Sequence, residues 1–239
     1  MKTTDELRTI AMRDFPDYLV TPTEITHILK TCEAMWAYSG NPADPHAILT
    51  AGDHSDGFVD VPKALVYPNL ARLFAYQLTK SVVSAHMSAH GELPKVDWVI
   101  GSDHASAPLV HFLGEFFNAK CDFTSKEQVA GSKRQVWNRH AIGPTETVLQ
   151  VEEIVTTSFT MNEVRRAIRE GNPYEVMFVP FAVTLVDRSD VIDIEGSPIL
   201  NLVHYDIRKW KPADCPLCRA GSKAIDSPKQ NWAELTGRA

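Results

Sequence analysis

Hydrophobic and polar positions alternate in a regular rhythm through the middle of the chain. Apolar runs rich in β-forming residues occupy residues 96–100, 121–124, 147–151 and 175–187. Apolar residues recur every three or four positions in residues 108–118 and 160–170, which is the period of a helix with one buried face. Strands that alternate with helices in this order predict an α/β domain, with a Rossmann-like, mainly parallel sheet flanked by helices.

Weaker patterns lie on both sides of this rhythm. Helical patterns begin after Thr21 and Pro68, and short strands at residues 47–51 and 58–61 enclose a polar loop. Residues 131–143 are polar and basic and show no periodicity, so we expect a loop there.

The last part of the chain differs in residue composition and in pattern. Residues 191–205 indicate a β-hairpin around a turn, and the residues that follow are rich in proline, lysine and small side chains. We interpret this end as a tail on one compact domain. The expected segments are an N-terminal part at 1–90, an α/β core at 91–190, and a hairpin with tail at 191–239.

Composition narrows the class of protein. Of the 239 residues, 44% are hydrophobic and 23% charged, which is typical of a globular protein. The net charge is −6, so the chain lacks the overall positive charge typical of nucleic-acid-binding proteins. No run approaches the roughly 20 apolar residues of a membrane span, and the first fifteen residues lack the apolar centre of a secretory signal. Four cysteines do not suggest a disulfide scaffold. We expect a cytoplasmic protein with no nucleic acid and no membrane as partners.

Two adjacent carboxylates, Glu152 and Glu153, follow the apolar run at 147–151, where the pattern predicts that a buried strand ends. Several hydroxyls come next, and the spacing of Thr160 and Glu163 fits a capping box at the start of a helix. Backbone N–H groups at such a helix start bind anions, and parallel sheets bind ligands at the carboxyl ends of their strands. Two acids beside an anion require a cation or sugar hydroxyls between them, so the pattern favours a phosphorylated sugar with Mg²⁺.

A purely structural explanation of the same residues is about as well supported as a ligand site. The glutamates would only end a strand, and the hydroxyls would only cap the following helix, because capping residues of this type are common.

Several motifs, in the same order along the chain, resemble one family. Residues 148–160 are similar to the phosphoribosyl diphosphate (PRPP) signature of type I phosphoribosyltransferases, in which an apolar strand leads into two acids and a threonine-rich loop. Residues 47–60 and 100–108 resemble the N-terminal segment and the pyrophosphate loop of the orotate-specific members. Lys126 and Glu127 resemble the start of the mobile catalytic loop, and residues 185–188 resemble the strand end after the signature.

The resemblance implies the phosphoribosyltransferase fold with a small N-terminal hood, and a Mg²⁺-dependent transfer of phosphoribosyl from PRPP to a nitrogenous base, with orotate as the first choice. It also implies a homodimer. Glu152 and Glu153 would hold the ribose hydroxyls, directly or through Mg²⁺. The implied 5′-phosphate cradle is Thr156, Thr157, Ser158, Phe159 and Thr160. The implied pyrophosphate site is Ser102, Asp103, His104, Ala105 and Ser106. Lys126, and Lys133 or Arg134 from the mobile loop, would neutralise the leaving group. The base side would include Ala51, Gly52 and Phe58.

The chain departs from the family pattern at four places. Ser158 and Phe159 stand where glycines usually follow the threonine pair, and both acids are glutamates. Residues 137–140 replace the usual Lys-x-His-Gly of the mobile loop, and Asn162 stands near the place of an arginine that contacts orotate in some members. These departures leave a second hypothesis open, a non-catalytic sensor or regulator that binds PRPP on the same fold.

A Cys-x-x-Cys pair, Cys215 and Cys218, has the spacing of half a zinc site, and Zn²⁺ usually takes four ligands. His204 and Cys121 are candidates for the other two. The alternative is that the two cysteines are small residues buried in a turn of the tail.

Overall fold

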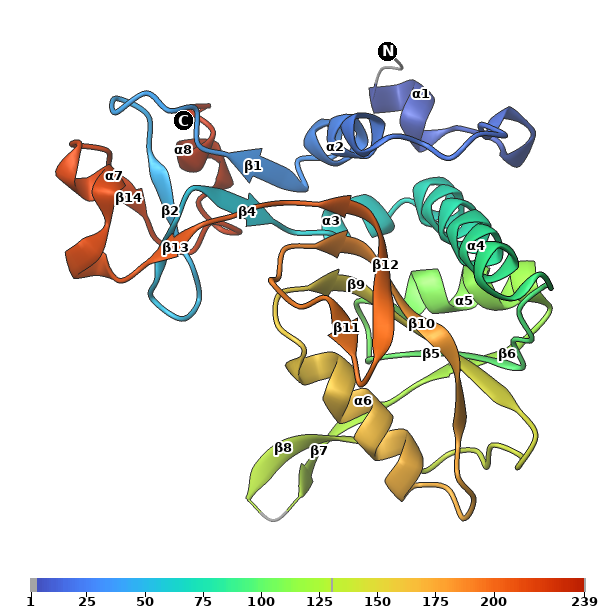
Figure 1. Cartoon of the computed structure of the whole chain (residues 1–239). Coiled ribbons are helices and arrows are strands. Elements are labelled where there is room, and N and C mark those ends of the chain that lie inside the picture. The colour runs from blue at the N-terminus through green and yellow to red at the C-terminus, as the bar shows by residue number, and fades with distance from the viewer. Residues whose placement is uncertain (1–3, 130, 239) are drawn as a thin grey trace. The chain divides into compact units, whose positions relative to one another are not determined.

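The computed structural model describes residues 4–129 and 131–238, and these residues form two compact units (Figure 1). Unit 1 contains the described residues up to Ile25 together with Leu65–Tyr205. Unit 2 contains Thr26–Ala64 and the described residues from Asp206 onward. This grouping differs from the three consecutive segments expected from the sequence, because each unit combines two stretches that are distant along the chain.

The core of unit 1 is a six-stranded, mainly parallel sheet, as the sequence predicts. In spatial order its strands are β11 (Asp193–Ile194), β12 (Ser197–His204), β10 (Met177–Asp187), β9 (Thr147–Val155), β5 (Trp98–Gly101) and β6 (Lys120–Phe123). All neighbours are parallel except β11, which pairs antiparallel with β12 as the predicted hairpin.

The strand order reverses between β5 and β9. From β5 the chain moves outward to β6 on one side, then returns to build β9, β10 and β12 on the other side. In doubly wound sheets, the crevice outside the carboxyl ends of the strands at such a reversal is where ligands bind. Any site in unit 1 is therefore expected just beyond Gly101 and along the end of β9.

Helices cover both faces of this sheet (Figure 1). On one face, α4 (Pro68–His90) contacts β10 and β12, and α5 (Ala107–Phe117) contacts α4, β5 and β6. On the other face, α6 (Phe159–Glu170) packs Val164 and Ile168 into a buried cluster with Trp98. Because successive side chains of a strand point to opposite faces, apolar runs such as 98–100 supply both layers at once.

The described chain begins with α1 (Thr4–Arg8), a 3₁₀ turn η1 (Met12–Asp14) and α2 (Pro22–Thr31), and the residues of α2 from Thr26 onward belong to unit 2. A capping box starts α2 where the sequence predicts a helix. The N–H of Thr21 donates to Glu24 Oε2 at 2.7 Å, and the N–H of Glu24 donates back to Thr21 Oγ1 at 3.3 Å.

The expectation of a loop at 131–143 is wrong for its first part. Strand β8 (Ser132–Val136) occupies that part and pairs antiparallel with the preceding β7 (Ser125–Val129), so that Lys126 faces Gln135 and Gln128 faces Lys133. Polar residues on both faces leave no apolar alternation to reveal the strands, so the backbone pairing alone defines them.

Unit 2 is a small β-rich body. Strand β1 (Met35–Ala37) pairs antiparallel with β4 (Gly57–Val59). A second sheet has the order β13 (Lys209–Trp210), β3 (His54–Ser55), β2 (His46–Ile48), β14 (Ala224–Ile225). Its short helices are α3 (Pro62–Leu65), η2 (Pro212–Asp214), α7 (Pro216–Arg219) and α8 (Trp232–Leu235).

The residues expected to form a tail are therefore integral to unit 2. Strands β13 and β14 flank the β2–β3 hairpin, and Ile225, Trp232 and Leu235 pack with Ala47 in the buried cluster of this unit. None of the described helices is both long and apolar enough to cross a membrane.

Candidate active site

The two adjacent glutamates lie within strand β9, not beyond its end as the sequence suggested. Strand β9 continues to Val155, and Glu152 is in register with Thr184 of β10. On its other side β5 stops at Gly101, opposite Val151. The chain that leaves β5 is therefore free to turn toward the glutamates at the reversal point of the sheet.

Ser102 makes that turn and binds Glu152. Its N–H donates to Glu152 Oε1 at 3.0 Å, and its hydroxyl donates to Oε2 at 2.7 Å. Burial, with only 2% of Glu152 exposed, raises the pKa of this carboxyl, and the nearby carboxylate of Glu153 raises it further. The two hydrogen bonds from Ser102 lower the pKa only in part. The glutamates thus form a crowded acidic site that a cation or hydroxyl donors would stabilise.

Gly101 permits the close approach of this turn to β9. A Cβ atom at position 101 would lie 2.7 Å from the carbonyl oxygen of Val151 and would overlap the hydroxyl of Ser106. That hydroxyl is buried and donates a short hydrogen bond to the carbonyl of Ser102. His104, at the tip of the loop, has φ +59, a left-handed conformation that costs energy in a non-glycine residue. The loop is held in a tight, preformed shape.

The structure brings Lys126 to the predicted pyrophosphate loop. Its Nζ lies 3.5 Å from Asp103 Oδ1, while His104 Nε2 lies 3.8 Å from the other oxygen of Asp103. Lys133 is exposed on β8. Arg134, on the same strand, instead approaches Glu163 of α6, with 3.4 Å between Nη2 and Oε1. Of the three basic residues implied for this site, only Lys126 contacts the loop.

The hydroxyl-rich turn leads into α6 as the sequence predicts, but the helix begins at Phe159. Ser158 is the N-cap residue and makes no side-chain capping bond, and the predicted Thr160–Glu163 capping box is wrong. Glu163 binds Arg166 Nε at 2.9 Å and Arg134 instead, and these contacts lower its pKa.

The side chains around this helix start remain accessible. Thr157 is exposed, and its Oγ1 accepts a long 3.4 Å bond from the N–H of Phe159. The Phe159 ring is 69% exposed, so it does not fill the core. Thr156, Ser158 and Thr160 are half-buried. Because the N-cap Ser158 makes no side-chain capping bond, the N–H groups at this helix start suit an anion.

A buried network of polar side chains connects α6 to β9. The sequence pattern did not predict this network. Arg165 is 2% exposed, and its Nε donates to Gln150 Oε1 at 2.8 Å. The amide of Gln150 donates to the carbonyl of Met161 at 2.8 Å, in the first turns of the helix. The one local signal is a glutamine inside an otherwise apolar strand, since a buried amide requires partners.

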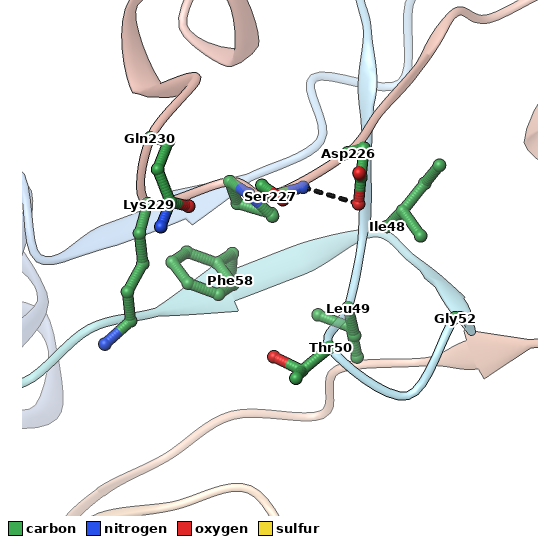
Figure 2. A pocket seen from close by; sticks show the side chains of 10 residues that line it. Ile48, Leu49, Thr50, Gly52, Phe58, Asp226, Ser227, Lys229 and Gln230 are labelled. Carbon is green, nitrogen blue, oxygen red and sulfur yellow. Dashed lines mark hydrogen bonds between the residues drawn. The ribbon is translucent and has the colours of Figure 1, made fainter.

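The residues expected on the base side lie in unit 2. Gly52, at φ +84, and Phe58 line a cavity of about 350 Å³ together with Asp226 and Lys229 (Figure 2). Ala51 is exposed in the turn between β2 and β3. A cavity described in unit 1, of about 260 Å³, lies between β8 and α6 and does not include the glutamates. The acidic site is thus recognised by its contacts and not by cavity size.

The cysteine pair lies in unit 2, but the other two residues named with it do not. His204 is bound to Asp187 of unit 1 at 3.4 Å, and Cys121 is an exposed residue of β6. The side chains that Cys215 and Cys218 do meet are those of His46 and His54.

Comparison with known proteins places these features in context. No model of a protein family matches the sequence. The chain is 29% identical over 177 residues to an orotate phosphoribosyltransferase from Caldicellulosiruptor bescii, a match that covers 74% of this chain and 84% of that one. It is also 29% identical over 184 residues to an orotate phosphoribosyltransferase from Heliobacterium modesticaldum, with coverage of 75% and 87%.

Among solved structures, an orotate phosphoribosyltransferase from Aeropyrum pernix superposes with a TM-score of 0.54 at 14% identity, over 75% of this chain and 93% of that one. At this identity the likeness establishes a shared fold.

Proposed function

We propose that this chain, which is similar in sequence to orotate phosphoribosyltransferases and has the fold of type I phosphoribosyltransferases, transfers a phosphoribosyl group from PRPP to orotate. The reaction joins a ring nitrogen of the base to C1 of the ribose and releases pyrophosphate. One observation carries the proposal: Ser102 binds Glu152 at the reversal point of the sheet. This contact joins the pyrophosphate loop to the acid pair where α/β sheets bind ligands.

Charge development in the reaction explains the acid pair. As the bond to pyrophosphate breaks, the ribose ring gains positive charge, as in glycoside cleavage. The carboxylates of Glu152 and Glu153 would accept hydrogen bonds from the ribose hydroxyls and stabilise that charge. The N–H groups and hydroxyls at the start of α6, from Thr156 to Thr160, would hold the 5′-phosphate.

The leaving pyrophosphate would be bound by the loop 102–106 and by Lys126. Successive backbone N–H groups in a tight loop of this kind suit an anion, and its preformed shape leaves little reorganisation for the reaction itself. Lys126 is 57% exposed and paired with Asp103, so a phosphate oxygen can replace Asp103 as its partner. Movement of the β7–β8 hairpin would add Lys133 and Arg134 to the same charge.

The residues present fit a magnesium ion. Carboxylate oxygens are the ligands Mg²⁺ prefers. Burial, and secondly the carboxylate of Glu153, raise the pKa of Glu152, and a cation bound there would stabilise its ionised form. Glu152 and Glu153 would hold Mg²⁺ directly or through water. When bound, the ion would offset the charge of the pyrophosphate oxygens.

Two further parts of the proposal follow from the resemblance alone: Ala51, Gly52 and Phe58 would contact the base, and the active form would be a homodimer. A third part, action in the cytoplasm, is supported by the cysteine usage, which does not suggest a disulfide scaffold. Light scattering on the purified protein measures the oligomer. A Phe58→Ala variant that raises the KM for the base without changing that for PRPP would support the base-side assignment.

Pyrophosphate release measured with PRPP, Mg²⁺ and one base at a time tests the function. We expect release with orotate and none with uracil, adenine or nicotinate. Release with a different base would correct the acceptor and keep the reaction. Calorimetric binding of PRPP without turnover on any base would indicate the non-catalytic sensor, and absence of both binding and turnover would contradict the proposed site.

A further inference from the structure

Four side chains with metal-binding atoms converge in unit 2, apart from the acidic site of unit 1. They are His46 on β2, His54 on β3, and Cys215 and Cys218 at the start of α7, and their ligand atoms all lie within 4.8 Å of one another. His46, His54 and Cys215 are at most 7% exposed, and Cys218 closes the cluster on the solvent side. Two chain segments far apart in the sequence thus deliver two imidazoles and two thiols to one point.

The separations match a tetrahedral metal site. Cys218 Sγ lies 3.2 Å from His54 Nδ1 and 3.4 Å from His46 Nε2, and Cys215 Sγ lies 3.6 Å from His46 Nε2. Zn–S bonds of about 2.3 Å and Zn–N bonds of about 2.0–2.1 Å in a tetrahedron require S–N separations of about 3.5 Å. The two nitrogens are 2.9 Å apart and would separate by about 0.4 Å to admit the ion.

Hydrogen bonds outside the cluster fix the protonation of His46. The hydroxyl of Ser222 donates its only proton to the carbonyl of Asp44, at 2.7 Å. Toward His46 Nδ1, 2.8 Å away, Ser222 can therefore only accept, so Nδ1 carries the proton. The lone pair of His46 is thereby on Nε2, which faces the other three side chains. Metal-binding histidines are oriented by an outer partner in this way.

The cysteine turn has a complementary feature. Cys215 is the N-cap of α7, and its sulfur accepts a hydrogen bond from the N–H of Cys218 at 3.5 Å. An N–H donor stabilises negative charge on the sulfur, which is the form that binds metal. Two thiolates carry a charge of −2 and two neutral imidazoles carry none, so together they offset the charge of one Zn²⁺ and the centre suits a buried position.

We propose that His46, His54, Cys215 and Cys218 bind one structural Zn²⁺. Four protein ligands leave no open position for substrate, so the ion stabilises unit 2 and takes no part in catalysis. The cluster that packs around Ala47, Ile225, Trp232 and Leu235 is small, and small cores commonly depend on a metal or a disulfide. The proposal is independent of the phosphoribosyl transfer, because none of the four residues belongs to the acidic site.

The test measures metal in untagged protein purified without chelators. We expect about one zinc per chain, and Co²⁺ in its place should show the intense visible absorption of a tetrahedral site with sulfur ligands. Cys218→Ser and His54→Gln should each lose most of the zinc. Cys121→Ser, at an exposed cysteine of unit 1, is the matched control and should retain it.

A second variant that leaves the four ligands in place tests zinc binding even if the ligand substitutions prevent folding. Ser222→Ala leaves all four ligands and removes only the partner of His46, so zinc affinity should fall about 10–100-fold. Metal-free wild-type protein that binds neither Zn²⁺ nor tetrahedral Co²⁺, or a Cys215–Cys218 disulfide in freshly purified protein, would overturn the proposal.

Discussion

Glu152 is a buried residue whose suitability for ligand binding opposes the stability of the unliganded fold. Its carboxyl is nearly inaccessible, accepts two bonds from Ser102 and lies beside the carboxylate of Glu153. A buried charge in such a place destabilises the unliganded fold until a cation or sugar hydroxyls reach it. Ionising Glu152 therefore costs the unliganded fold stability, and its raised pKa means that the site holds a proton near neutral pH until a ligand displaces it.

This cost makes a prediction about Glu152→Gln and pH. The pKa of Glu152 is raised in the folded state, so the folded protein holds this proton more tightly than the unfolded chain. The stability that it contributes is present below the ordinary glutamate pKa and is lost as pH rises through the raised folded value. Glutamine resembles the protonated form, so the variant should gain stability relative to wild type between about pH 5 and pH 9.

Urea unfolding of both proteins across that range measures the difference. The same Gln substitution at exposed Glu92 is the control and should leave the pH profile unchanged. A constant difference between Glu152→Gln and wild type at all pH values would contradict the raised pKa.

Glu153→Gln should separate catalysis from stability. Glu153 is half-buried next to Glu152, and its charge would act on the ribose in the transition state. We expect kcat to fall about 100-fold, as for other single electrostatic groups, while the unfolding free energy changes by less than about 1 kcal/mol. Steady-state kinetics and urea unfolding of the same preparation measure both, and equal losses in the two would mean that the acid pair is structural.

The residues of the site that sequence could predict are those defined by neighbours along the chain. The acid pair, the hydroxyl turn and the loop 102–106 are such local patterns. The Arg165–Gln150 bond and the meeting of Cys215 with His46 could not be predicted, because they join residues at least fifteen positions apart. The capping box failed because α6 begins earlier than that spacing requires: Ser158 is the N-cap, so Thr160 already lies inside the helix, and Glu163 pairs with Arg166 and Arg134.

At the scale of elements, apolar periodicity located the strands and helices but not all of their ends. Strand β9 extends through Glu152 to Val155 because β10 pairs with it along that length, a partner that no local pattern displays. Strand β8 lies in the segment 131–143 that the sequence predicts to be a loop, because the residues of the β7–β8 hairpin are polar on both faces and no local pattern displays the pairing. Backbone hydrogen bonds between paired strands do not depend on side-chain type, so the sequence does not show them as it shows the alternation of buried and exposed side chains.

The junction of β5 with its loop yields a prediction for Gly101→Ala. The added methyl would meet the carbonyl of Val151 at 2.7 Å, which is backbone and cannot move aside as a flexible side chain would. We expect a loss of about 1–3 kcal/mol in unfolding free energy. Phosphoribosyl transfer should also slow, because Ser102 would be displaced from Glu152.

Gly143→Ala is the matched control, since the nearest atoms to its added methyl belong to the Glu146 side chain at 3.4 Å. It should change stability by less than about 0.5 kcal/mol. Thermal or urea unfolding distinguishes the two glycines, and equal effects would mean that the close approach at Gly101 is relaxed in solution.

At the scale of the whole molecule, the chain leaves unit 2 after Ala64, builds the sheet of unit 1, and returns at Asp206. Unit 1 contains a six-stranded sheet with helices on both faces, whereas unit 2 contains short strands and a buried cluster around Ala47. The two units therefore differ in what stabilises them, and the proposed zinc bears on only one.

Chelation should expose this difference. If zinc joins the two segments of unit 2, its removal should accelerate amide exchange at least about tenfold in residues 46–55 and 209–225, because metal-binding energy is folding energy. Residues 147–187 of the unit 1 sheet should keep their protection. Mass-spectrometric hydrogen exchange with and without chelator measures both, and uniform acceleration across the chain would contradict a role confined to unit 2.

Unit 2 is built from two segments that are far apart in the chain, and this affects the folding of the protein while it is synthesised. The β2–β3 hairpin emerges from the ribosome early, but β13 and β14, which pair with its two edges, emerge only after Leu65–Tyr205 has been made. At about 5–20 residues per second, that delay is on the order of 10 s. Throughout it the nascent chain presents two unpaired strand edges, which are templates for aggregation. The yield of active protein should therefore depend on translation speed and on chaperones more than its final stability would suggest.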